Sequence, residues 1–79
     1  MKELYQAKLN GNQVWFVREQ NNTIGQMFNS LKDAMLFHEG KEVSPFGIAV
    51  NEEVLTHGTS VGFIKEVIHE VPKVVEKFI

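Results

Sequence analysis

Cysteine is absent from this chain of 79 residues, so disulfides and thiolate metal sites are both excluded. A domain of this length buries only about 60–65% of the surface that its unfolded chain exposes, and small folds often rely on a disulfide, a metal or oligomerisation. The chain therefore depends on a well-packed core or on a partner, and its length predicts one domain over residues 1–79. The lack of cysteine also fits a reducing compartment.

Long apolar runs are also missing. The densest ones, Val14–Val17 and Phe46–Val50, are too short to span a bilayer. No apolar stretch follows Lys2, so we expect no secretory signal. The hydrophobic fraction of 43% is too high for a disordered chain. These features predict a soluble cytoplasmic protein.

A strong charge of one sign is lacking too. The net charge is −2, no two of the eight basic residues are adjacent, and only Arg18 is an arginine. Nucleic-acid binding needs a basic patch, ideally with aromatic platforms. Tyr5, Trp15 and Phe16 can stack on bases, so a nucleic-acid-binding or DNA-associated regulator is the alternative function, disfavoured by the missing charge.

The first nineteen residues predict a β-hairpin. Two strand-like runs, Glu3–Leu9 and Gln13–Glu19, flank Asn10-Gly11, the strongest two-residue hairpin signal. With these two residues at the tip, Ala7 faces Val14 and Tyr5 faces Phe16. A three-residue turn through Asn12 would instead pair Ala7 with Trp15, so the sequence leaves the register open.

A helix is expected near the middle of the chain, after a short strand over Ile24–Phe28. Asn29 or Ser30 can cap it, and Gly40 follows its end. Its apolar face is formed by Leu31, Ala34 and Met35, with His38 at the same spacing.

Ser44-Pro45 then precedes another strand, Phe46–Val50. Residues 51–57 fit either a helical turn that ends at Gly58 or a continuation of the strand to Leu55. The acidic pair behind Asn51 favours the helical turn.

The last third of the chain predicts a long helix. Apolar residues recur at helical spacing over Val61, Ile64, Val67, Ile68, Val71, Val74, Val75 and Phe78. A strand would place Lys65 and His69 among the apolar residues, which favours the helix. Pro72 interrupts it, so either one helix kinks there or two helical pieces share one apolar surface. The predicted fold is a two-layer α+β domain: the N-terminal antiparallel hairpin, one or two further short strands, and two helices packed against them.

Of all segments in the sequence, the run Thr56-His57-Gly58-Thr59-Ser60 most resembles part of an active site. It lacks the G-x-S-x-G elbow, and a serine nucleophile needs an oriented base that nothing here supplies. A helix start explains the run better, with Thr59 or Ser60 as the cap. An anion can dock at such a start, so Gly58–Gly62 is a weak candidate anion site.

Metal and cofactor sites are not predicted. The three histidines, His38, His57 and His69, lack the i, i+4 pairing of a helical metal site, and there is no H-E-x-x-H motif. We therefore predict no catalytic, cofactor-binding or metal-binding residue and no enzyme activity.

The predicted function is that of a small non-catalytic cytoplasmic protein that binds another protein and modulates or inhibits it. The apolar C-terminal helix is also a candidate surface for homodimerisation. An apolar surface that extends beyond so small a sheet is a candidate interface. The predicted partner-binding residues are Trp15, Val71, Val74, Val75, Phe78 and Ile79.

Overall fold

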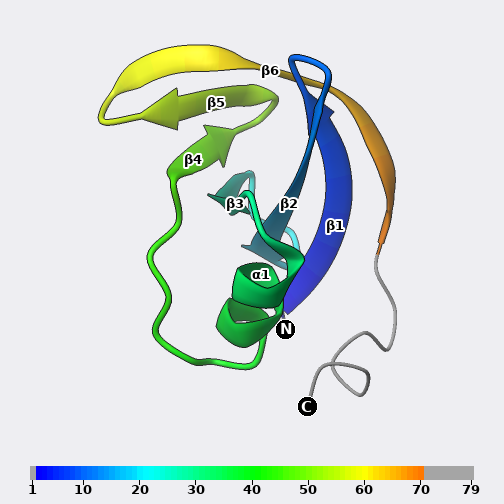
Figure 1. Ribbon diagram of the computed structural model, residues 1–79, viewed down its shortest axis with the longest axis vertical. Coiled ribbons are helices and arrows are strands. Elements are labelled where there is room, and N and C mark those ends of the chain that lie inside the picture. The colour runs from blue at the N-terminus through cyan, green and yellow to red at the C-terminus, as the bar shows by residue number, and fades with distance from the viewer. Residues whose placement is uncertain (1, 71–79) are drawn as a thin grey trace.

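The computed structural model describes the backbone of residues 2–70, and the side chains of these residues except 65, 66 and 68–70 (Figure 1). It contains six strands and one helix in this part of the chain. The elements are β1 (Lys2–Leu9), β2 (Asn12–Glu19), β3 (Ile24–Phe28), α1 (Leu31–His38), β4 (Gly47–Val50), β5 (Glu53–Thr56) and β6 (Thr59–Glu70).

The six strands form a closed antiparallel barrel in which each strand pairs with the next along the chain. The barrel closes where β6 pairs with β1, with Leu9 opposite Ile64. Figure 1 shows β6 passing over β5 and then along the outside of β1. The prediction of a two-layer α+β domain with two helices is therefore wrong: the described chain is mostly β, with one short helix.

Two tight turns set the register of the barrel. Asn10 and Gly11 have φ angles of 51° and 85°, and His57 and Gly58 have φ angles of 53° and 81°. Positive φ at both central residues matches a type I′ turn, which suits the twist of a two-residue hairpin. The first hairpin accordingly pairs Ala7 with Val14, the first of the two registers that the sequence allows.

Residues 59–70 are a strand, so the helix predicted there is wrong. The pairing of β6 contains register shifts, one against β5 and two against β1. Each shift changes which face the following side chains occupy, so β6 loses the strict alternation by which a strand is recognised. The β-branched residues Val61, Ile64 and Val67 fit the pleated surface. Pro72 and the rest of residues 71–79 lie outside the described residues.

Residues 53–56 are also a strand rather than part of a helical turn. Asn51 has a φ of 59° and begins the tight connection in which Val50 pairs with Glu53. Asparagine tolerates this conformation because its side chain is short and polar.

The helix predicted in the middle of the chain is present. Ser30 is its N-cap and its Oγ accepts a hydrogen bond from the Asp33 amide at 3.4 Å. Gly40, with a φ of 98°, follows the helix end. No helix among residues 2–70 has the length and apolar character needed to cross a membrane.

Two apolar cores lie on opposite faces of the β1–β3 part of the sheet. The barrel interior contains Ala7, Leu9, Val14, Phe16, Met27, Ala49, Val54 and Ile64, with Tyr5 and Phe46 against them. The second core lies between the outside of the barrel and α1 and contains Leu4, Val17, Phe28, Ala34 and Met35, with Trp15, Leu31, Phe37 and Val43 around them.

Candidate functional site

A row of side chains crosses the outside of the barrel from β3 to β6. Ile24 is the direct cross-strand partner of Val50, Val50 of Glu53, and Glu53 of Phe63. Direct partners in an antiparallel sheet project from the same face. Because the alternate residues Ala49 and Val54 are buried in the interior, this row faces outward.

A second outward row lies beside the first. Gln26 pairs with Ile48, and Ile48 pairs with Leu55. Together the two rows form a surface that we call the outer patch, made of Ile24, Ile48, Val50, Leu55 and Phe63. Phe63 is 48% exposed, Ile24 44% and Ile48 36%, so the patch presents large apolar side chains to solvent.

The helix covers only one part of the outer barrel surface and leaves the outer patch exposed to solvent. The outer face of β1, β2 and β3 carries Leu4, Val17 and Phe28, and α1 packs over them so that each is at most 2% exposed. Figure 1 shows α1 beside β3 and the start of β1, away from β4 and β5. The outer patch continues the same sheet surface beyond the helix, where its apolar side chains remain exposed.

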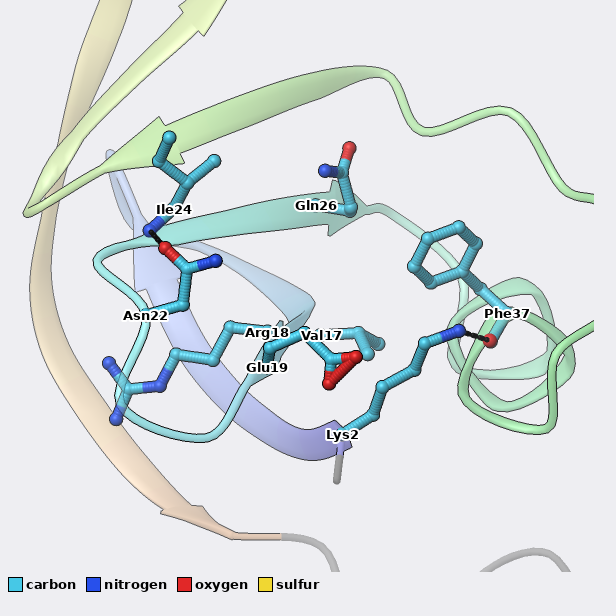
Figure 2. Close-up of a pocket in the computed structure, with 8 residues that line it drawn as sticks. All are labelled: Lys2, Val17, Arg18, Glu19, Asn22, Ile24, Gln26 and Phe37. Carbon is cyan, nitrogen blue, oxygen red and sulfur yellow. Dashed lines mark hydrogen bonds between the residues drawn. The ribbon is translucent and has the colours of Figure 1, made fainter.

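A groove of about 200 Å³ lies between the outer patch and α1 (Figure 2). Ile24 and Gln26 line one side, and Phe37 and Lys2 line the other; the remaining lining residues are Val17, Arg18, Glu19 and Asn22. Lys2 Nζ donates to the Phe37 carbonyl at 3.3 Å and lies 4.6 Å from the centre of its ring. The groove therefore joins the outer patch to the end of the helix.

The opposite border of the outer patch is acidic. A shallow hollow of about 330 Å³ is lined by Val50, Asn51, Glu52, Glu53 and Phe63. Glu52 is exposed in the β4–β5 turn, and Glu53 is half-buried between its apolar partners. Two carboxylates thus lie beside Phe63, the most exposed side chain of the patch.

A polar cluster of Glu3, Tyr5 and Arg18 lines a hollow of about 420 Å³ beside the loop between β2 and β3. The Tyr5 hydroxyl donates to Glu3 Oε1 at 2.7 Å, and Arg18 donates to the Tyr5 hydroxyl at 3.4 Å. The guanidinium lies 4.8 Å from the Tyr5 ring centre, and that ring stacks on Phe16. The hydrogen bond to the Glu3 carboxylate raises the pKa of Tyr5 because it stabilises the neutral phenol, while Arg18 opposes this effect. Arg18 Nε also lies 3.7 Å from Glu3 Oε1, so the three side chains are paired with one another, which suits a structural role.

Of the sequence-predicted partner-binding residues, the described part of the chain contains Trp15 alone. Trp15 lies on the outer face of β2, half-buried beside the α1 core. Its indole Nε1 is buried and has no hydrogen-bond partner among residues 2–70. The others, Val71, Val74, Val75, Phe78 and Ile79, lie outside the described residues, so their role stays a prediction.

The candidates for chemistry are dispersed. His57 and Gly58 form the β5–β6 turn and Ser60 follows in β6, so the helix start predicted at this run is wrong, and so is the helix-start anion site at Gly58–Gly62. His38 Nε2 lies 3.1 Å from the Lys2 carbonyl. Within the part of the chain that the structure describes, no three histidine, aspartate or glutamate residues are grouped to hold a metal ion.

Sequence reasoning missed the outer patch. Ile48 and Val50 alternate with the buried Ala49, and this alternation marks a strand with two apolar faces. The alternation alone does not say which of the two apolar faces is buried; the barrel interior and the position of α1 determine that.

Comparisons of the chain with protein-family models, with curated proteins and with solved structures find no match.

Proposed function

We propose that this protein is a small non-catalytic module that binds another protein through the outer patch and thereby modulates or inhibits it. The observation that carries the proposal is the exposure of Ile24, Ile48 and Phe63 on adjoining strands of one sheet face. Adjoining apolar side chains of this size on the surface of a small domain are typical of an interaction site.

The closed barrel limits how a partner can bind. Each described strand pairs with a neighbour on both sides, so none of the six is a sheet edge along its whole length. Addition of a partner strand requires an exposed edge. A partner of the outer patch must therefore contact side chains rather than extend the sheet.

Burial of the patch supplies a favourable free energy of binding. Fully burying a leucine-sized or phenylalanine side chain contributes about 1.5–3 kcal/mol. About half of that remains available at Phe63 and Ile24, which are 48% and 44% exposed. A few such side chains at the centre of an interface can carry most of the binding energy.

Nucleic-acid binding, the alternative from the sequence, finds less support on this face. Glu52 and Glu53 border the patch, and their carboxylates would repel phosphates. The homodimer predicted through a C-terminal helix loses its basis over residues 61–70, which form a strand. Self-association through the outer patch is an outcome that the experiment below distinguishes.

The test is affinity capture from host lysate with tagged wild type, Phe63→Ser, Ile48→Ser and the control Val67→Ser. Val67 is 50% exposed but pairs with Ala7 of β1, so it lies outside the two rows of the patch. We expect one protein to survive nuclease treatment and to be lost with both patch variants but retained by the control. Circular dichroism confirms that each variant is folded. Capture that persists in both patch variants, or that disappears with nuclease, would contradict the proposal, and recovery of the chain alone would indicate self-association.

A further inference from the structure

We infer that the partner of the outer patch is a protein segment that places a lysine or arginine against Glu52 and Glu53 and apolar side chains over Phe63, Val50 and Ile24. This inference rests on the proposed function and adds the chemistry of the partner.

The position of Glu53 is the first step. It lies in the outward row between Val50 and Phe63, and it is half-buried there. A carboxylate with apolar neighbours on both sides loses part of its hydration, and a partner that covers the row removes more. Covering it is unfavourable unless the partner supplies an opposite charge or hydrogen-bond donors.

The turn that carries the two carboxylates is held in place by backbone hydrogen bonds. The Ile64 amide donates to the Glu52 carbonyl at 2.7 Å, and the Asn51 amide donates to the Thr23 carbonyl at 3.1 Å. These bonds connect the turn to β6 and to the start of β3. The acidic border therefore has a fixed place beside the apolar rows, which favours recognition over a diffuse charge effect.

Among the residues whose side chains the structure describes, none forms an ion pair or a side-chain hydrogen bond with Glu52 or Glu53. By contrast, Glu3 is paired with both Tyr5 and Arg18. Both carboxylates at the β4–β5 turn are thus available to a partner.

Lysine and arginine suit this site for two reasons. Their aliphatic stems lie along apolar surfaces while the charged head reaches a polar group, which matches the arrangement of Phe63 beside Glu53. Electrostatic complementarity also fixes the register of a partner on an apolar surface. A second copy of this chain would have to bring Lys2 or Arg18, from the groove beside its own patch, to the acidic border. Lys2 already donates to the Phe37 carbonyl and Arg18 is paired with Glu3, which favours a different partner.

The experiment selects random peptides from a phage-displayed library on the immobilised chain, followed by fluorescence anisotropy with the selected peptides. The variants are Glu52→Gln/Glu53→Gln, Phe63→Ser, and the control Glu39→Gln/Glu42→Gln. The control removes the same charge at two exposed positions of the segment between α1 and β4.

We expect selected peptides to carry lysine or arginine next to apolar residues. Their affinity should fall about three- to tenfold in Glu52→Gln/Glu53→Gln at low salt, consistent with two ion pairs that stay partly exposed to solvent, and should be unchanged in the control. Binding should be lost in Phe63→Ser.

Two other outcomes overturn the inference in different ways. Peptides that are lost in Phe63→Ser but show no basic enrichment and bind Glu52→Gln/Glu53→Gln normally would contradict the partner chemistry and leave the proposed function standing. Peptides that bind Phe63→Ser as well as wild type, or a selection that enriches none, would contradict both.

Discussion

Asn10, at the tip of the first hairpin, is hydrogen-bonded across the barrel seam to Val61: its Nδ2 donates to the Val61 carbonyl at 2.8 Å. The next residue, Gly62, has a φ of 149° and lies directly beneath the Asn10 side chain. A Cβ on Gly62 would lie 2.8 Å from Asn10 Oδ1, closer than real Cβ atoms approach a neighbour. The tip of the first hairpin therefore meets β6 at a position that requires glycine.

Gly62→Ala is expected to destabilise the protein by about 2–3 kcal/mol, because it combines backbone strain with displacement of the Asn10 side chain. Gly58→Ala is the matched control: Gly58 also has a positive φ, 81°, but a Cβ there meets nothing within 4 Å. It should cost about 1 kcal/mol. Urea unfolding measures both, and equal losses would show that the Asn10 contact contributes nothing.

Met35→Ala is expected to lower the free energy of unfolding by about 2–5 kcal/mol. Met35 is 1% exposed in the core between α1 and the sheet. Lys32→Ala, on the exposed side of the same helix, should change stability by less than about 0.5 kcal/mol. Thermal unfolding followed by circular dichroism compares the two. A similar small effect for both would mean that α1 does not support the barrel.

Ser30→Ala is expected to cost about 1 kcal/mol, because the helix loses its N-cap hydrogen bond to the Asp33 amide. Asn29→Ala should have little effect, since Asn29 precedes the cap and is exposed. Urea unfolding of the two variants decides which residue caps the helix. A larger loss for Asn29→Ala would contradict the assignment.

Tyr5 is the sole tyrosine, so absorbance at 295 nm reports its ionisation directly. Its pKa is raised above the usual value of about 10, first by the hydrogen bond to Glu3. Glu3→Gln should lower this pKa, and Arg18→Met should raise it further, because Arg18 favours the phenolate. An unchanged pKa in Glu3→Gln would contradict the role of the carboxylate.

The same shift has a consequence for stability. Because the folded-state pKa of Tyr5 lies above the unfolded value, the neutral phenol stabilises the fold fully below about pH 10, and this contribution is lost as the pH rises through the folded-state pKa. Tyr5→Phe should remove this part of the alkaline loss. Urea unfolding between pH 9 and 11 (roughly the range around the tyrosine pKa) compares the variant with wild type.

Local signals predicted the first hairpin and α1 because short-range chemistry governs both. Asn10-Gly11 specifies a turn through its own φ preferences, and Ser30 caps a helix through the amide three positions later. Neither depends on distant parts of the chain. The outer patch was not predictable in this way, since Ile48 and Phe63 become neighbours of one surface only when β5 pairs with both β4 and β6.

By itself, the sequence determined that the fold has no disulfide, because the chain contains no cysteine. It also determined the tip of the first hairpin and the capped helix, since each follows from residues close together in the chain. Tertiary structure decided that residues 59–70 form a strand. Their apolar spacing matches a helix, but their backbone pairs with β5 and β1. The strand is favoured because β6 closes the barrel and so satisfies the backbone hydrogen bonds of β1 and β5, which would otherwise be open sheet edges. The register shifts in β6 accommodate a sequence in which apolar and polar residues do not strictly alternate. The placement of α1 over β1–β3 then decided which apolar side chains stay exposed.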